Sequence, residues 1–436
     1  MTHSIGSVWS DTVYRKTRPR LENDITTDVL IIGGGICGIL AAHKLKQAGV
    51  RPIVVEAKSI GNGITKNTTA KITAQHGLIY ADLMKKLGVE NARQYYDANT
   101  QAIQRYRELA QQFPCDVEDK TAYVYSTINR QKLEREAAAY GRLGINAQFQ
   151  ENPPLPFKTT GALGMEGQAQ FHPLKLLYAL ANDLEIYENT FVCKINGRVA
   201  TTSKGKIKAK NIVLATHYPL INIPGLYFMK LYQHRSYVIA LENAPILGGV
   251  YVDHRDDGHS FRAYDNLLFI GGGDHKTGKH GGGYAELRTL AKQAYPHATE
   301  KYRWVTQDCM TLDNIPYIGR HRARVENLFV ATGFNKWGMT GAMVAAELLS
   351  NLIVTGKSDL AELYNPGRSM ISRQLFINIG SAAKGLLSLG SPRCTHMGCK
   401  LRWNAAEKSW DCSCHGSRFD KTGHVVNNPA KRGIHL

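Results

Sequence analysis

Acidic residues are scarce in this chain, with 36 aspartates and glutamates against 54 lysines and arginines, which gives a formal net charge of +18. Long uncharged apolar runs are also missing, so we expect no membrane-spanning helix. The first residues carry charges and no apolar h-region, so we expect no secretory signal. These absences together predict a cytoplasmic protein.

Internal repeats, low-complexity tracts and nucleic-acid-binding modules are absent as well. A basic charge balance suits nucleic acid, an anionic membrane surface or an acidic protein partner. The lysines and arginines are spread along the chain, so we expect no nucleic-acid partner. A solvated basic surface is the first interpretation, and peripheral membrane contact and an acidic electron-transfer partner stay open.

The eight cysteines divide unevenly along the 436 residues, a length for which we expect two or three domains. Cys37, Cys115, Cys193 and Cys309 are scattered, and we interpret them as small buried side chains. The other four lie close together near the C-terminal end. Such clustering in a cytoplasmic chain favours a metal site over a disulfide scaffold.

The segment from Asp28 to Glu56 predicts a dinucleotide site. An apolar strand leads into Gly33-x-Gly35-x-x-Gly38, a helical pattern follows, and a second strand ends at Glu56. Gly33 permits a tight turn, Gly35 lets backbone N–H groups approach a pyrophosphate, and Gly38 lets helix and strand pack closely. The helix N-terminus then faces the phosphates, and Glu56 can accept from a ribose hydroxyl.

Beyond this unit the pattern changes from alternating strands and helices to short strands separated by turns. That second pattern fills residues 235–273 and indicates an antiparallel sheet. A second glycine-bounded turn, Gly333 to Gly341, leads into another helix. The expected helices cover 80–112, 130–143, 174–184 and 342–352, and the expected strands include 123–125, 207–216 and 325–331.

On these motifs the chain resembles the FAD-dependent oxidoreductases of the D-amino-acid oxidase and glycine oxidase type over residues 28–355. Further anchors are Phe171-His172-Pro173, Ala215-Thr216, Asp313-x-x-Pro316-x-x-Gly319 and the turn from Gly333 to Thr340. The resemblance implies an α/β Rossmann-like FAD-binding domain with an inserted antiparallel-sheet substrate domain (α+β). It also implies FAD-binding roles for Gly33, Gly35, Gly38, Glu56, Val192, Gly338, Met339 and Thr340, the last three at the flavin ring.

The substrate site departs from the family pattern. The family places an arginine about five residues before its Asp-x-x-Pro to clamp a substrate carboxylate, and ungapped counting puts Asp308 there. This departure argues against an amino-acid substrate and favours a cationic amine. Basic residues along the sheet suit an anionic donor instead, but a nearby motif fixes the position of Asp308. The catalytic residue stays unknown, with Asp308, Arg262 and His275 as candidates.

Two Cys–His pairs, Cys394-x-His396 and Cys412-x-x-His415, can offer two thiolates and two imidazoles. This set suits a Rieske [2Fe–2S] cluster, in which histidines replace cysteines on one iron, and it could also satisfy tetrahedral zinc. Residues 386–436 resemble the Rieske family. The resemblance implies a small all-β segment with these four residues as cluster ligands and a disulfide between Cys399 and Cys414, which disfavours zinc.

Two positions differ from the Rieske pattern. High-potential members carry a tyrosine where this chain has Phe419, so we expect a midpoint potential below the top of the Rieske range. The usual Gly-Pro-Ala loop is Asn428-Pro429-Ala430 here. The segment is also short for a free-standing Rieske domain, so we expect it to dock against the flavoprotein.

The expected domain plan has four parts. They are an N-terminal extension (1–27), an oxidoreductase (28–365), a linker (366–385) and a Rieske domain (386–436). Within the oxidoreductase, FAD-binding parts are expected at about 28–80, 155–234 and 305–355, and substrate-domain parts at about 81–154 and 235–304.

These features predict a FAD-dependent oxidoreductase that oxidises a small amine-like donor. Electrons would pass between the flavin and the Rieske cluster, and on to a partner protein or a quinone. A flavin suits this role because it converts two-electron chemistry into one-electron steps. Two alternatives stay open: an electron-transfer or redox-sensing protein without an organic substrate, and an NAD(P)H-linked reductase. No second GxGxxG in a strand–helix context supports the latter.

Overall fold

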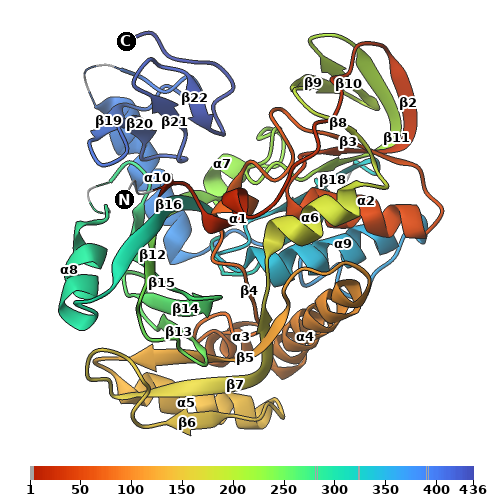
Figure 1. Cartoon of the computed structure of the whole chain (residues 1–436). Helices are drawn as coiled ribbons and strands as arrows, with labels where there is room; N and C mark the ends of the chain where they lie inside the picture. The colour runs from red at the N-terminus through yellow and green to blue at the C-terminus, as the bar shows by residue number, and fades with distance from the viewer. Residues whose placement is uncertain (1–3, 280, 282, 323–324, 389, 391) are drawn as a thin grey trace.

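The computed structural model describes residues 4–279, 281, 283–322, 325–388, 390 and 392–436. Two large sheets and one small sheet organise the chain (Figure 1). One large sheet carries the segment from Asp28 to Glu56, the other carries most of the central part of the sequence, and the small sheet lies near the C-terminal end. This arrangement agrees with the predicted combination of a Rossmann-like part, a strand-rich insert and a terminal all-β segment.

The first sheet has the order β17-β18-β11-β2-β3-β8, in which the pairs from β18 to β8 are parallel. Strands β3 and β18 and the C-terminal halves of β2 and β11 are buried apolar runs, as expected for strands covered on both faces. A hairpin of two further strands extends β11. The strands are β2 (Ile25–Ile32), β3 (Pro52–Val55), β8 (Glu185–Tyr187), β9 (Val192–Asn196), β10 (Val199–Thr202), β11 (Lys206–Leu214), β17 (Tyr317–Arg320) and β18 (Leu328–Thr332).

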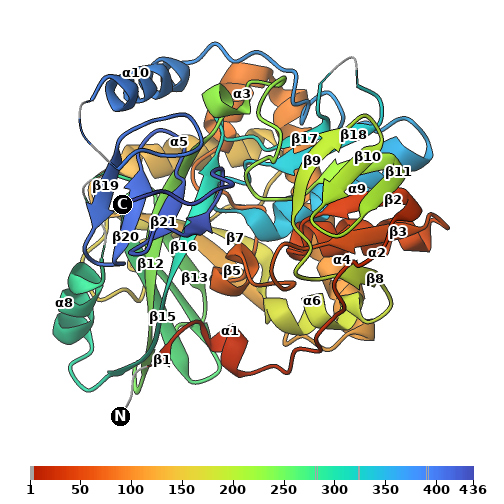
Figure 2. The ribbon, with the colours of Figure 1, turned by 90° about the horizontal axis from the view of Figure 1, so that it is seen from above.

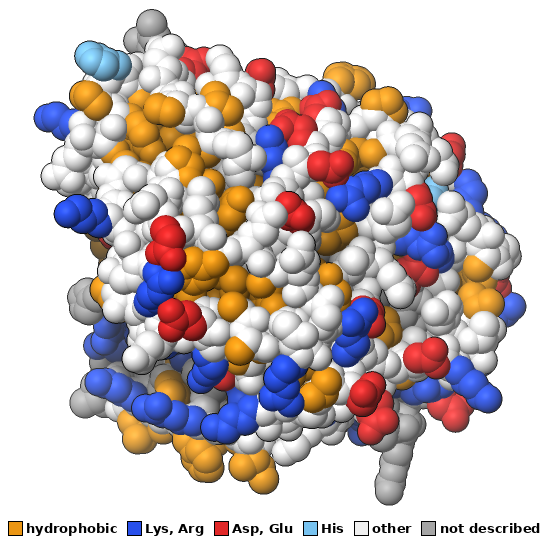
Figure 3. Space-filling view, turned by 90° about the horizontal axis from the view of Figure 1, so that it is seen from below, with side chains coloured by type: hydrophobic (Ala, Val, Ile, Leu, Met, Phe, Trp, Pro, Cys, Tyr) orange, Lys and Arg blue, Asp and Glu red, His pale blue; other side chains and the backbone are white. Residues whose placement is uncertain are grey.

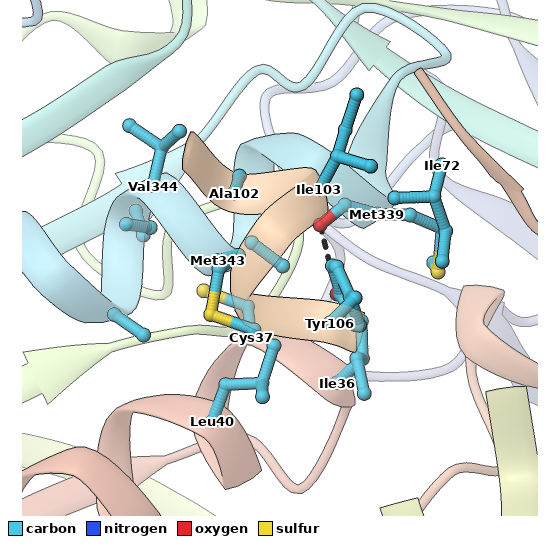
Figure 4. Packing of buried hydrophobic residues seen from close by; sticks show 14 of the residues in the cluster. Ile36, Cys37, Leu40, Ile72, Ala102, Ile103, Tyr106, Met339, Met343 and Val344 are labelled. Carbon is cyan, nitrogen blue, oxygen red and sulfur yellow. Dashed lines mark hydrogen bonds between the residues drawn. The ribbon is translucent and has the colours of Figure 1, made fainter. Parts of the chain in front are cut away.

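Three helices pack together beside this sheet: α2 (Ile36–Gln47), α6 (Pro173–Ala181) and α9 (Gly338–Val354). Helix α2 is apolar on nearly all sides because it contacts both α6 and α9. Figure 4 shows Cys37 and Leu40 of α2 meeting Met343 of α9. This packing fixes the N-termini of α2 and α9 relative to each other.

The second sheet has the order β1-β16-β12-β15-β14-β13-β5-β7-β4, with β6 paired to β7. Most of its pairings are antiparallel, as predicted, but β13 pairs with β5 in parallel, and so does β1 with β16. Its strands are β1 (Ser4–Ile5), β4 (Lys71–Ile72), β5 (Glu118–Ser126), β6 (Gln148–Gln150), β7 (Gly161–Gln170), β12 (Tyr232–Glu242), β13 (Val250–Asp253), β14 (Ser260–Tyr264), β15 (Leu267–Lys276) and β16 (Thr299–Met310).

The strands of this sheet come from segments that the sequence assigns to both parts of the oxidoreductase. Strands β4, β7 and the end of β16 lie in segments expected to belong to the FAD-binding part. Their pairing partners are distant in sequence, so local patterns could not assign them. The accompanying helices are α3 (Tyr80–Leu87), α4 (Val89–Gln112), α5 (Arg130–Arg142) and α8 (Ala285–Ala294).

The N-terminal segment is part of the fold rather than an extension from it. Strand β1 pairs with β16, and the short helix α1 (Val8–Asp11) buries Trp9 completely. The indole Nε1 of Trp9 donates to the carbonyl of Thr68 at 2.8 Å. The buried indole of Trp9, whose N–H has a hydrogen-bond partner, anchors the N-terminal segment to the rest of the fold.

The C-terminal sheet consists of β19 (Leu401–Asn404), β20 (Ser409–Cys412), β21 (Arg418–Asp420) and β22 (Val425–Asn427), joined in sequence order as an antiparallel meander. The segment expected to be a linker contains most of helix α10 (Arg373–Leu387), for which Ser372 provides the N-cap. Figure 2 shows α10 along the outer edge of the molecule. No helix in the part of the chain that the structure describes is long and apolar enough to cross a membrane.

Candidate functional site: a dinucleotide cavity beside a Cys–His cluster

The turn after β2 requires glycine at two of the predicted positions. Gly33 has φ +117°, and a Cβ there would lie 2.4 Å from the carbonyl oxygen of Ala215. A Cβ on Gly38 would lie 2.0 Å from the carbonyl oxygen of Gly33. Gly35 is the N-cap residue of α2, so the free N–H groups of the first helical turn follow it directly.

Glu56 follows β3, and its carboxylate already accepts two backbone hydrogen bonds. Oε2 accepts from the N–H of Gly34 at 2.8 Å, and Oε1 accepts from the N–H of Lys58 at 2.9 Å. Burial raises the pKa of Glu56 above its usual value. These bonds hold the carboxylate at the end of the strand, where a ribose hydroxyl can reach it.

A cavity of about 830 Å³ opens at these residues, a volume within the usual range for cofactor sites. It connects the turn after β2 with the N-terminus of α9, so it can hold an extended dinucleotide between two helix N-termini. Six of the eight predicted FAD-binding residues line it, namely Gly33, Gly35, Glu56, Val192, Gly338 and Met339.

The other two predicted residues, Gly38 and Thr340, do not line the cavity but lie in the first turns of the helices α2 and α9 that border it. The Oγ1 of Thr340 donates to the carbonyl of Thr73 at 3.0 Å and lies 3.1 Å from Nε2 of His76. The His76 ring stacks on Trp337, the N-cap residue of α9, at 5.0 Å. Thr340 therefore positions the start of α9, because its hydroxyl bonds to Thr73 and His76, two residues that do not line the cavity.

The loop after β3 covers the cavity and is held from two sides. Its 3-10 turn η1 (Ile64–Asn67) includes Thr65, whose Oγ1 accepts from the N–H of Ile36 at 3.0 Å. The indole of Trp304 donates to the carbonyl of Asn67 at 2.9 Å. Because Trp9 binds the next residue, Thr68, the loop is fixed against both the sheet and the N-terminal segment.

Of the three catalytic candidates, only Asp308 lines the cavity. Burial raises the pKa of Asp308 to about 6, although Lys336 opposes this shift. Arg262 is buried elsewhere, where it donates to the carbonyl of Thr69 and lies over the rings of Trp9, Tyr264 and Phe269. His275 is buried against Tyr237, with Nδ1 3.0 Å from the carbonyl of Gly273. Both side chains, on β14 and β15, are buried among neighbouring residues, away from the cavity.

Sequence reasoning missed other charged groups around Asp308. Lys336 forms an ion pair with Asp274, and burial lowers the pKa of Lys71 to about 7. Lys71 stands at the start of β4, a strand of two residues that has no recognisable sequence pattern. The ion pair joins β15 to the turn before α9, so only the folded chain brings these groups together.

The second centre is formed by the two C-terminal loops. Cys394 and Cys412 lie in hydrogen-bonding contact, and each sulfur accepts backbone N–H groups from the loop that follows it. Cys399 and Cys414 form a disulfide between the loops. The sulfurs of Cys399, Cys412 and Cys414 lie within 4.8 Å of one another, but the two disulfide sulfurs are not thiolates and cannot serve as ligands.

The two histidines of the same loops lie against each other. The rings of His396 and His415 are 5.0 Å apart, and both Nδ1 atoms are buried without a hydrogen-bond partner among the described residues. Burial lowers the pKa of His396 to about 4 and that of His415 to about 3, which favours the neutral form that binds metal. Two thiols and two unpartnered imidazole nitrogens fit the donor set of a Rieske cluster.

The cluster loops are docked on the large sheet through buried amides. Nε2 of Gln233 donates to the carbonyls of His415 at 2.7 Å and of Asn428 at 3.1 Å. Nε2 of Gln307 donates to the carbonyl of Gly416 at 2.9 Å. Asn428 in turn donates to the carbonyl of Thr216 at 2.7 Å. The expected docking of this segment against the flavoprotein is therefore a close, polar contact.

A buried charge network adjoins these amides. Glu407 accepts from Arg235 of β12, from Tyr237 at 2.9 Å and from Arg418 of β21 at 2.6 Å. Arg418 also pairs with Asp411 at 2.9 Å. Arg235, Glu407 and Arg418 all line the cavity, and so do residues 425–431. The terminal segment thus forms one wall of the dinucleotide cavity.

One expectation about the remaining cysteines was wrong. Cys37, Cys115 and Cys309 are buried, but Cys193 is exposed. It lies in β9, part of the hairpin that extends beyond the sheet, so it has no core to enter.

Two protein-family models match this chain. Residues 28–352 match the FAD-dependent oxidoreductase family known as DAO, and residues 352–435 match the Rieske [2Fe-2S] domain. The Rieske 2Fe-2S iron-sulfur protein YhfW of Bacillus subtilis is 34% identical over 97% of this chain and 95% of its own. γ-Glutamylputrescine oxidoreductase of Escherichia coli is 23% identical over 76% of this chain and 85% of its own.

A solved structure agrees with the fold. Glycine oxidase from Geobacillus kaustophilus superposes with a TM-score of 0.65 at 20% identity, covering 79% of this chain and all of its own. At this identity the likeness concerns the fold alone. The matches over nearly the whole chain, the cavity and the Cys–His loops agree: the chain belongs to the DAO family of FAD-dependent oxidoreductases, with a Rieske [2Fe-2S] domain at its C-terminal end.

Proposed function

We propose that this FAD-dependent oxidoreductase oxidises a small amine and passes electrons between its flavin and its Rieske cluster, and on to a partner protein or a quinone. The observation that carries the proposal is the shared cavity, whose walls come from both the FAD-binding motif and residues 425–431 of the cluster domain. Bound FAD supplies the conversion of a two-electron donor oxidation into single-electron steps.

Hydrogen bonds connecting the cavity with the cluster loops support the electron route. Asn428 lines the cavity, and its carbonyl accepts from Gln233, which also donates to the carbonyl of the predicted ligand His415. The ring of His396 lies 6.3 Å from Tyr218, which lines the cavity too. The ring of His396 thus contacts a cavity-lining residue, and the backbone of His415 is joined to another, Asn428, through Gln233.

At the cavity wall, the carboxyl of Asp308 favours a cationic amine. Arg235 is paired with Glu407, and Lys336 is paired with Asp274, so each of these cations already has an acidic partner. Asp308 lies on the same wall, and no ion-pair partner within hydrogen-bond distance is found for it in the described parts of the chain. The name of the E. coli relative specifies a derivative of putrescine, which agrees with an amine substrate for this chain.

A stopped-flow screen tests this function directly. Amines, amino acids, NADH and NADPH are mixed separately with the oxidised holoprotein, and flavin bleaching and cluster reduction are followed at their own wavelengths. We expect an amine to bleach the flavin first and reduce the cluster afterwards. Bleaching by NADH or NADPH alone would instead indicate a nicotinamide-linked reductase, and bleaching by none of them an electron-transfer or sensing role.

Asp308→Asn is expected to lower kcat/KM for the amine about 10- to 100-fold, the cost of losing a hydrogen bond to a charged group. Because the carboxyl has its pKa near 6, it is mostly protonated below that pH and ionised above it. The parent kcat/KM should therefore rise with pH through about pH 6. In the variant this rise should disappear.

The matched control is Asp257→Asn, which changes an exposed carboxylate and should leave kcat/KM unaltered. FAD content and cluster spectrum should be normal in both variants. Parent-like turnover and pH profile in Asp308→Asn would make Asp308 structural and remove the main support for an amine.

The midpoint potential of the cluster offers a second test. The Ser417 hydroxyl contacts the sulfur of Cys394, and Phe419 is fully buried in the same small core. Ser417→Ala should lower the midpoint by about 40 mV, equal to about 1 kcal/mol for one electron. Phe419→Tyr should raise it, because a phenol can donate to a sulfur and stabilise the reduced cluster. Redox titration followed by EPR measures both, and an unchanged midpoint in Phe419→Tyr with an intact cluster contradicts this account.

A further inference from the structure

Helix α10 directs its apolar face away from the protein. Phe376, Ile379, Ala383, Leu386 and Leu387 recur at helical spacing and share one side of the helix. All five are exposed, Phe376 at 66% and Leu387 at 81%. A helix that stabilises a globular core turns its apolar side inward, so this outward face calls for another partner.

A neighbouring side of α10 is buried, and this fixes the orientation of the helix. Leu375, Asn378 and Gly385 are buried, and Asn378 donates to the carbonyl of Met229 at 3.4 Å. A Cβ on Gly385 would lie 2.5 Å from the sulfur of Cys414, so the helix rests directly on the disulfide of the cluster loops. Rotating the apolar face inward would break this close approach.

The sequence around α10 carries charge of one sign. No aspartate or glutamate occurs between Glu362 and Glu407, and this stretch carries Arg373, Lys384, Arg393, Lys400 and Arg402, besides Arg368, which is paired with Asp313. Arg373 and Lys384 are exposed residues of α10 itself. Figure 3, seen from below, shows hydrophobic side chains protruding at the lower left edge of the molecule beside a row of lysines and arginines. Figure 2, seen from above, shows α10 along the same edge, there at the upper left.

We propose that the outward face of α10 docks on the surface of an anionic lipid bilayer. Phe376, Leu386 and Leu387 would enter the boundary between headgroups and acyl chains, while Arg373 and Lys384 would meet anionic headgroups. The contact is interfacial, since no described helix can span a bilayer. The cluster loops, directly beneath α10, are thereby held next to the membrane surface.

Two other occupants suit the face less well. A second copy of the chain, packed on the same face about a two-fold axis, would bring two sets of like charges together. An acidic protein carrier would match the arginines and lysines but leaves unexplained why large aliphatic side chains protrude beside them. A bilayer with anionic headgroups satisfies both the charge and the apolar projection.

The test uses the purified holoprotein and two kinds of vesicle, phosphatidylcholine alone and phosphatidylcholine mixed with phosphatidylglycerol, in a sedimentation assay. We expect binding to the mixed vesicles that weakens at high salt. The double variant Phe376→Asp/Leu387→Asp should bind at least tenfold less. The matched control, Ile128→Asp/Ile246→Asp, changes two exposed apolar residues elsewhere and should bind like the parent.

FAD and cluster spectra establish that each variant is folded, and these readouts do not depend on the identity of the substrate. Absence of binding to the mixed vesicles overturns the proposal, and so does equal binding by the α10 variant. Sedimentation velocity covers the remaining case: a parent dimer that dissociates in the α10 variant, without vesicle binding, assigns the face to a second copy and also overturns it.

Discussion

Replacing His396 or His415 by alanine is expected to abolish the Rieske spectrum and lower the iron content more than tenfold, while the flavin spectrum persists. Each substitution removes one of the two buried, unpartnered imidazole nitrogens of the loops that carry Cys394 and Cys412. Second-shell changes alone cost about 10- to 100-fold in metal affinity, so loss of a direct ligand should cost more. The predicted FAD-binding residues come from other segments and are unaltered.

Iron and zinc analysis, visible absorption and EPR measure this result on protein produced with iron available. His435→Ala, which changes an exposed histidine of the same domain, is the control and should retain the parent spectrum. Stoichiometric zinc without iron in the parent, or an intact Rieske signal in both histidine variants, would contradict the assigned ligand set.

Glu407→Gln is expected to destabilise the docking of the cluster domain by about 3 to 5 kcal/mol, the usual cost of removing one partner from a buried ion network. The side chains of Arg235, Glu407 and Arg418 are 4%, 11% and 5% exposed, so water screens them poorly. Without the carboxylate, the two guanidinium groups are left facing each other. Arg235 belongs to the large sheet and Arg418 to the small one, so the loss falls on the contact between them.

Chemical unfolding, followed separately by cluster absorbance and flavin fluorescence, measures this cost. We expect the cluster signal to be lost at lower denaturant than in the parent, and electron transfer from photoreduced flavin to the cluster to slow. Glu326→Gln removes an exposed carboxylate and is the matched control. If Glu407→Gln unfolds and transfers electrons like this control, the network does not hold the domains together.

The sequence predicted those parts of the site that short motifs encode. The glycines and Glu56 fall within one strand–helix–strand unit, and the cluster residues lie in two loops of recognisable spacing. Such features depend on local backbone requirements, for example the positive φ of Gly33. The family resemblance added the position of Asp308, which does line the cavity.

The contacts between the two parts could not be predicted, because they depend on strand register and docking. Gln233 and Gln307 reach the cluster loops only because β12 and β16 pair with these residues on one face, and nothing in their local sequence marks them. The sequence predicts a linker at 366–385, where the structure instead has most of the continuous helix α10. Arg262 and His275, two of the catalytic candidates from the sequence, do not line the cavity, because Arg262 lies over three aromatic rings and His275 stacks on Tyr237.

The placement of the tryptophans has a spectroscopic consequence. Trp9 and Trp304 bind the loop over the dinucleotide cavity, and Trp337 precedes its α9 wall, whereas Trp403 and Trp410 lie 5.2 Å apart in the cluster domain. Each of the five tryptophans of the chain thus lies in a part of the fold that would hold one of two strongly absorbing groups, FAD or the iron–sulfur cluster. Energy transfer to flavin should quench the first three, and the iron–sulfur cluster the other pair. Intrinsic fluorescence can therefore report how fully each centre is loaded during preparation, without any added label.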